Sequence, residues 1–97
     1  MSLSYEIETL REEIKRLTVK IVELGWRRVN LAVEVGKIKK TSNLPLEDPA
    51  VEKALEEEVL KLCNLQGIDR RFALNLLNLL ISESKRLQRT FFQELSE

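Results

Sequence analysis

Two cations with helical spacing, Arg28 and Lys39, are the residues of this sequence best placed to do chemistry. They fall at positions i and i+11 and share a helical face with Ala32 and Val35. A cation on an otherwise apolar face is costly unless an anion pairs with it. This face therefore predicts either an internal ion pair, with Glu52 as the candidate partner, or a site for an anionic ligand.

Polar residues also interrupt the apolar faces of two later segments. Asp48 and Glu52 lie on the same side as the apolar residues that follow them, and Ser84 and Gln88 occupy positions where the pattern calls for apolar side chains. Each has an ordinary structural interpretation: a helix cap for Asp48, an interhelical hydrogen bond for Ser84 and Gln88, and a favourable helix C-terminus for Lys39. If the helices fold back on one another, however, these groups converge into one polar pocket.

Composition narrows the chemistry that such a pocket can perform. The chain has no histidine and a single cysteine, Cys63, which excludes a zinc site and Cys-His or Ser-His nucleophile pairs. Sixteen basic and sixteen acidic residues cancel, so there is no electrostatic case for nucleic-acid binding. No apolar run approaches the roughly 20 residues of a membrane span, and no signal peptide is evident. We expect one cytoplasmic domain over residues 1–97.

The pocket residues must be positioned by an unusually long helix, predicted over residues 5–41. Its apolar stripe alternates steps of four and three, which is the repeat of a helix that buries one seam. The stripe consists of Leu3, Ile7, Leu10, Ile14, Leu17, Ile21, Leu24, Arg28, Leu31, Val35 and Ile38. Such a helix is about 55 Å long, whereas a compact domain of this size has a radius of gyration of about 12 to 13 Å. One chain cannot cover it, which favours an intertwined homodimer.

Two shorter helices complete an all-α fold. Asp48 and Pro49 are an N-cap and a first helical residue, and Gly67 ends that second helix. Asp69 is the candidate cap of a third helix over about residues 70–94. No segment alternates with period two, so no strand is expected. The prediction is a three-helix chain whose two shorter helices fold back on the first.

These residues, taken together, resemble one known family, the all-α chorismate mutases. The resemblance runs from about residue 5 to residue 93. Its matching segments are Leu10–Ile14, Arg27–Lys39, Pro45–Asp48, Glu52 and Ser84–Gln88. It implies an intertwined dimer of three-helix chains that converts chorismate to prephenate, the branch step toward phenylalanine and tyrosine, and that needs no cofactor.

The resemblance also implies roles for individual residues. Arg11 of the partner chain and Arg28 hold the two substrate carboxylates. Lys39 donates to the ether oxygen and to a carboxylate, Gln88 donates to the same ether oxygen, and Glu52 accepts from the ring hydroxyl. Two further residues line the pocket and position the substrate, namely Asp48 and Ser84. These residue types suit a pericyclic rearrangement, in which the enzyme holds a compact dianion and stabilises charge on one oxygen without transferring a proton.

One position departs from the family pattern, and two other functions stay open. Val51 stands where the family usually has an arginine, so we expect a raised KM unless a neighbouring cation such as Lys40 or Lys53 replaces it. Isochorismate-pyruvate lyase is an alternative of similar fold, against which Glu52 argues as a hydroxyl acceptor. A non-catalytic helical interaction module is the other alternative, in which Arg28 and Lys39 would be structural.

Overall fold

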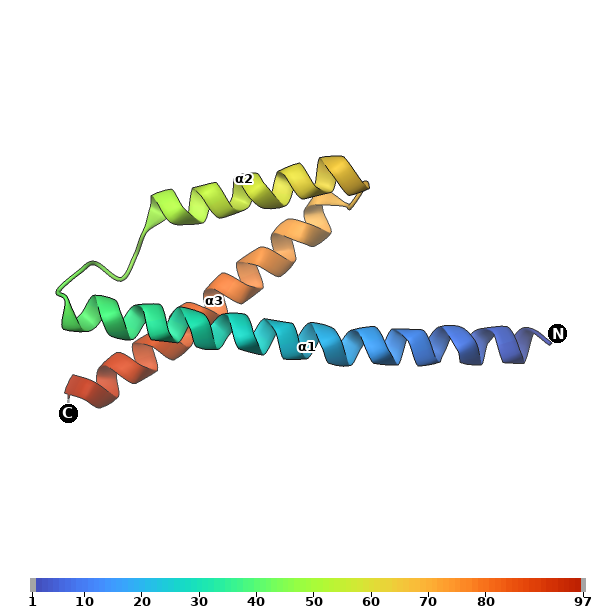
Figure 1. Ribbon diagram of the computed structural model, residues 1–97, viewed down its shortest axis with the longest axis horizontal. Helices are drawn as coiled ribbons and strands as arrows, with labels where there is room; N and C mark the ends of the chain where they lie inside the picture. Colours follow the sequence, from blue (N-terminus) through green and yellow to red (C-terminus); the bar gives the residue numbers. More distant parts are fainter. Residues whose placement is uncertain (1, 97) are drawn as a thin grey trace.

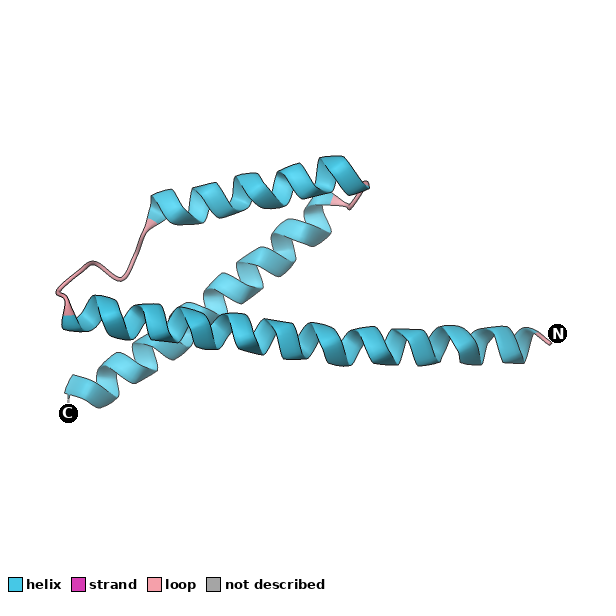
Figure 2. Cartoon of the chain, viewed as in Figure 1, coloured by secondary structure: helices cyan, strands magenta, loops and turns pink. Residues whose placement is uncertain are grey.

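The protein consists of three helices joined by two short connections (Figure 1). The computed structural model describes residues 2–96, and side chains to residue 91. The helices are α1 (Leu3–Thr41), α2 (Pro49–Gln66) and α3 (Arg70–Ser96), and the described residues contain no strand (Figure 2). The predicted all-α fold with one very long N-terminal helix is therefore confirmed.

Local capping chemistry sets the helix ends where the sequence predicts them. The Asp48 carboxylate accepts a hydrogen bond from the backbone N–H of Val51 at 3.3 Å, as an N-cap does. Gly67 ends α2 in a left-handed conformation, with φ of 66°, which costs glycine little. The Asp69 carboxylate caps α3 by accepting from the N–H of Phe72 at 2.8 Å. These three signals fix both connections.

The packing order of the helices differs from the prediction. α3 crosses the C-terminal half of α1 and α2 packs on α3, but within the described chain α2 does not pack on α1 (Figure 1). The expectation that both shorter helices fold back directly on the first is therefore wrong for α2. The connection over residues 42–48 carries the chain away from α1, and α3 then bridges the two helices.

The face of α1 that α3 covers is also not the apolar stripe. It carries small residues at helical spacing. Val29 and Gly36 are buried, and a Cβ atom added at Gly25 would lie 3.5 Å from Leu80. Small side chains let another helix approach closely, and this explains why α3 packs there. A single chain therefore leaves the stripe uncovered, as the length of the helix predicted.

The stripe itself lies open along α1. Its ten aliphatic residues are between 46% and 76% exposed, and they run from Leu3 to Ile38. The N-terminal half of α1 projects away from α2 and α3 (Figure 1), and the molecule measures 62 × 31 × 15 Å. Its radius of gyration, 18.0 Å, far exceeds the roughly 13 Å of a compact domain of this length. A single chain thus leaves a long apolar surface uncovered.

Candidate active site

All three helices contribute side chains to one polar cavity of about 150 Å³. It lies where α3 crosses α1 and where α2 begins. Six of the seven residues that the sequence indicated line it: Arg28, Lys39, Asp48, Glu52, Ser84 and Gln88. The seventh, Arg11, does not. The three polar interruptions of the helical faces therefore converge, although they are separated by up to 60 residues of sequence.

Arg28 is held by α3 and not by a carboxylate. Its guanidinium donates to the Ser84 hydroxyl at 3.1 Å, and this hydroxyl donates in turn to the carbonyl of Leu80 at 2.8 Å. Ser84 is 5% exposed, so its hydroxyl is fully committed to orienting the arginine. Among the described residues no carboxylate pairs with Arg28, and Glu52 pairs with Lys85. The cation therefore keeps its capacity to bind an anion.

Lys39 and Gln88 each donate one N–H to a backbone carbonyl and keep at least one further N–H donor. The ammonium of Lys39 donates to the carbonyl of Leu46 at 3.3 Å, which ties the end of α1 to the following connection. The amide nitrogen of Gln88 donates to the carbonyl of Ala32 at 2.6 Å. A lysine has three N–H donors and a glutamine amide has two, so both residues can donate to a ligand without breaking these bonds.

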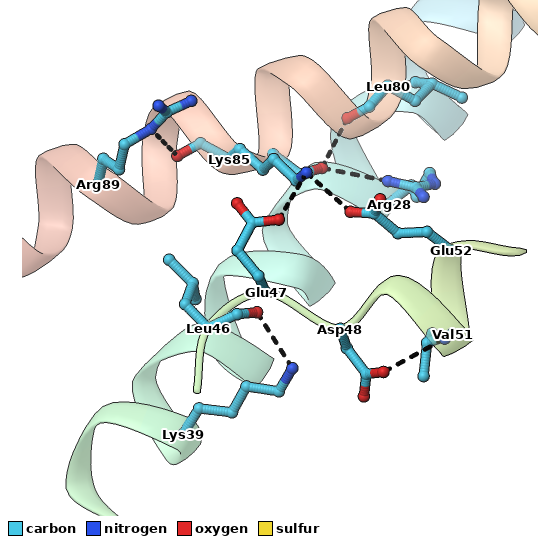
Figure 3. A network of polar contacts seen from close by, with 11 residues as sticks. Arg28, Lys39, Leu46, Glu47, Asp48, Val51, Glu52, Leu80, Lys85 and Arg89 are labelled. Carbon is cyan, nitrogen blue, oxygen red and sulfur yellow. Dashed lines mark hydrogen bonds and ion pairs between the residues drawn. The ribbon is translucent and has the colours of Figure 1, made fainter. Parts of the chain in front are cut away.

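The sequence did not single out Lys85, which lies at the centre of the polar network in Figure 3. Its ammonium lies 2.8 Å from Glu52 Oε1 and 3.0 Å from Glu47 Oε2, and the side chain lines the cavity. Hydrogen bonds to Glu52 and then Glu47 raise the pKa of Lys85 above its ordinary value. No sequence spacing could reveal this cluster, because its partners lie more than 30 residues away on other elements.

Gly36 is a second residue that sequence reasoning missed. A Cβ atom at this position would lie 3.0 Å from Cγ of Gln88 and 3.3 Å from its amide nitrogen. The glycine therefore makes room for the Gln88 side chain to lie across α1. The signal available from sequence was a glycine inside a helix with no other helix breaker beside it. Such a glycine lowers helix stability by about 1 kcal/mol relative to alanine, so its presence suggests a packing reason, and the structure shows that Gly36 is buried.

Arg11 lies far from the cavity of its own chain. It is on the projecting half of α1, where its guanidinium pairs with Glu8 at 2.9 Å and its side chain is 69% exposed. Seventeen residues separate it from Arg28, or about 25 Å along the helix. Within one chain these two arginines cannot bind the same small molecule.

Val51 lines the cavity, as its place in the first turn of α2 predicted. The suggested substitutes Lys40 and Lys53 are not among the residues that line it. The described residues contain no group of three His, Cys, Asp or Glu side chains that could hold a metal ion. They also include no helix with the length and hydropathy needed to cross a membrane.

The sequence was compared with known families and proteins. A family model for chorismate mutase type II matches residues 10–89. Chorismate mutase of Methanocaldococcus jannaschii is 29% identical over 89 residues, covering 92% of this chain and 90% of that protein. Bifunctional chorismate mutase/prephenate dehydratase of Escherichia coli is 35% identical over 85 residues, but the match covers 22% of it.

A third relative is named for a different activity. It is 4-amino-4-deoxychorismate mutase of Streptomyces venezuelae, 24% identical over 88 residues, which are 91% of this chain and 85% of that protein. The similarity to all three relatives extends over most of α1, α2 and α3. With the family match over residues 10–89, the three-helix fold and the cavity where those helices meet, the chain belongs to the chorismate mutase type II family.

Proposed function

We propose that this protein is an isomerase that converts chorismate to prephenate, a step of aromatic amino acid biosynthesis, and that the cavity between the three helices is its active site. One observation supports this above the others. Arg28, Lys39, Gln88 and Glu52 come from three helices to one cavity in a chain of the chorismate mutase type II family. They are the donors and the acceptor that a hydroxylated dianion with an ether oxygen requires.

The chemistry needs binding and electrostatics only. Arg28 offers a planar fork of donors to one substrate carboxylate, and Ser84 holds that fork in place. The remaining N–H groups of Lys39 and Gln88 point to the ether oxygen, where negative charge develops as the carbon–oxygen bond breaks. Glu52 accepts from the ring hydroxyl with the oxygen that Lys85 does not bind. Together they hold the compact diaxial conformer, which lowers the entropic part of the barrier.

The proposed enzyme is an intertwined homodimer, because a single chain leaves its apolar stripe exposed and Arg11 far from the cavity. An open apolar cavity of about 370 Å³ lies beside the polar cavity, between α2 and α3. It is lined mainly by apolar side chains, including Leu55, Val59, Leu62, Phe72, Leu76 and Leu80. Arg28 and Leu55 line both cavities, so the two lie side by side. The exposed stripe of a second copy has the apolar character to fill this space.

In that dimer the partner subunit supplies Arg11 to the cavity that holds Arg28. An antiparallel pair of α1 helices places residue i of one copy opposite residue 39 − i of the other when the two-fold axis lies between residues 19 and 20. This relation pairs 11 with 28. The second substrate carboxylate then has its own guanidinium, and each dimer contains two equivalent sites.

A direct absorbance assay with chorismate and, separately, isochorismate tests the function. We expect the chorismate signal to disappear with formation of prephenate and isochorismate to remain unchanged. Lys39→Ala should lower kcat by about a hundred- to a thousandfold, the usual cost of losing one preorganised donor. Lys53→Ala is the matched control, because Lys53 is exposed and outside the cavity. Cleavage of isochorismate would indicate the lyase, and inactivity on both would indicate an interaction module.

A further inference from the structure

We propose that Lys85 is a specificity-determining residue that acts through Glu52, by making the cavity select a ring hydroxyl over a ring ammonium. The inference rests on the proposed function, in which Glu52 binds the substituent of the substrate ring. It assigns a role to a cation that neither the sequence pattern nor the proposed chemistry uses. It also addresses a distinction within the family, since one relative is a 4-amino-4-deoxychorismate mutase.

Lys85 lines the cavity together with Glu52, and its ammonium lies beside the carboxylates of Glu52 and Glu47 (Figure 3). Its ammonium binds Glu52 Oε1 at 2.8 Å and Glu47 Oε2 at 3.0 Å. The Lys85 side chain is 28% exposed and Glu52 is 38% exposed, whereas Glu47 is 65% exposed. Solvent therefore screens Glu47 more than it screens the Lys85–Glu52 pair. The charge of Glu52 is compensated from inside the protein before any ligand binds.

A compensated carboxylate treats the two ring substituents differently. A hydroxyl donates one neutral hydrogen bond to the free oxygen of Glu52 and brings no charge with it. An aliphatic amine is protonated at neutral pH, so its ammonium would sit on the same carboxylate as Lys85. Two like charges on one carboxylate repel at a separation of a few ångströms, which is a repulsive element against the amino substrate. The hydroxyl substrate meets no such repulsion.

Other charges of the cavity do not reverse this preference. Arg28 and Lys39 add two further cations, which favour the substrate carboxylates and oppose an ammonium. Asp48 also lines the cavity, but one of its carboxylate oxygens accepts from the backbone N–H of Val51, so the positive start of α2 offsets its charge. Lys85 is thus the cation in direct contact with Glu52, the carboxylate that binds the ring substituent. Removing its charge should leave Glu52 uncompensated and favour a cationic substituent.

The test compares chorismate with 4-amino-4-deoxychorismate as substrates of the dimeric enzyme. The measured quantity is the ratio of kcat/KM for the amino substrate to kcat/KM for chorismate. Lys85→Gln keeps a neutral donor for Glu52 and removes the charge, and we expect it to raise this ratio by at least about tenfold. Lys61→Gln removes an exposed lysine paired with Glu58 outside the cavity, and it should leave the ratio unchanged.

A double-mutant cycle separates this role from a structural one. In a Glu52→Gln background, Lys85→Gln should leave the ratio within about twofold, because the carboxylate through which Lys85 acts is gone. Lys85→Arg restores the charge and should restore the wild-type ratio even if Lys85→Gln folds poorly. An unchanged ratio in folded Lys85→Gln, or the same shift in the Glu52→Gln background, overturns the inference. Wild-type inactivity on chorismate would instead overturn the proposed function.

Discussion

The side chains around the polar cavity share one property at the residue scale, which is spare hydrogen-bonding capacity. Arg28, Lys39 and Gln88 each spend one N–H on Ser84 or on a backbone carbonyl and keep the others. These internal bonds restrict the rotamers before a ligand arrives. The entropy of ordering the side chains is therefore lost on folding and not on binding, which is what electrostatic preorganisation requires.

We expect kcat/KM to vary little between pH 6 and pH 9. The chain has no histidine, and Asp, Glu and Lys ordinarily change charge outside this window. The raised pKa of Lys85 moves its deprotonation further toward alkaline pH, so stabilisation from its pairs with Glu52 and Glu47 is lost only as pH rises through that folded-state pKa. A pH–rate profile with chorismate checks this. A steep bell centred near neutrality would demand an acid or base outside the proposed set.

Val51→Arg should lower KM and raise kcat/KM by about tenfold or more. The valine lines the cavity in the first turn of α2, so an arginine there faces the substrate dianion. A charge-assisted hydrogen bond contributes about 1.5 to 3 kcal/mol, or roughly ten- to a hundredfold in binding. Lys85 does not replace this cation, because it is bound to Glu47 and Glu52.

Steady-state kinetics of folded Val51→Arg check this expectation, with Val51→Gln as the matched variant that adds length without charge. The charged variant should improve KM more than the neutral one. Equal kinetics for wild type and Val51→Arg would show that the arginine pairs with Asp48 or Glu52 and leaves the substrate alone.

Sequence reasoning located cavity residues well where they broke a helical pattern. Arg28, Ser84 and Gln88 are polar residues on apolar faces, and their positions in the stripe predicted that they point inward. Lys85 breaks no pattern, because a lysine beside the interior face of a helix is ordinary. Its importance depends on where α2 and the connection before it place Glu52 and Glu47, which only the tertiary structure supplies.

At the scale of elements, α1 presents two functional faces. One carries small residues, where α3 approaches closely and sends Gln88 across the helix. The other carries the exposed aliphatic stripe. Heptad spacing predicted the stripe but not which helix would cover it, because periodicity does not identify the partner of a face. Helix ends were easier to predict, since Asp48, Gly67 and Asp69 act through local hydrogen bonds and backbone conformation.

Gly36→Ala should lower kcat/KM by about ten- to a hundredfold. Its new methyl group would lie 3.0 Å from Cγ of Gln88, so the glutamine must shift away from the position in which it donates to Ala32. The glutamine must move by a few tenths of an ångström, whereas a misplacement of about 1 Å at a reacting centre can cost about a hundredfold, so we expect the lower part of this range. Steady-state kinetics and thermal melting of the folded variant check the expectation.

Gly25→Ala is the matched control for Gly36→Ala. Its added Cβ would lie 3.5 Å from Leu80, which is ordinary van der Waals contact, and Gly25 does not line the polar cavity. It should raise the free energy of unfolding by up to about 1 kcal/mol through helix propensity and leave kcat/KM unchanged. Full activity of Gly36→Ala would show that Gln88 can relocate without loss of function.

At the scale of the whole molecule, the extended shape is the feature that a single chain leaves unexplained. Among the described side chains none is fully enclosed, and the buried hydrophobic ones are Val29, Cys63 and Leu77. Apolar surface contributes about 25 cal/mol to folding for each Å² removed from water, so an uncovered stripe of ten aliphatic residues forgoes much of that stabilisation. The length of α1 predicted this from sequence alone. In the proposed homodimer, α1 of the partner subunit would cover the stripe and would also supply Arg11 to the site.

Mixing two inactive variants tests the shared site. Arg11→Ala and Arg28→Ala each remove one carboxylate-binding guanidinium, so each homodimer should lose most of its kcat/KM, by about a hundredfold or more. In a heterodimer of the proposed kind, Arg11 enters the cavity of the partner, so one cavity should receive both alanines and the other should keep both native arginines. Subunit exchange should therefore recover activity, up to half of the wild-type value for each heterodimer.

Arg16→Ala mixed with Arg28→Ala is the matched control. Arg16 is an exposed arginine of the same helix, paired with Glu13, and we expect its homodimer to be fully active before mixing. If heterodimers form by native mass spectrometry and yet recover no activity, Arg11 does not cross the interface and the two carboxylates must be bound within one chain.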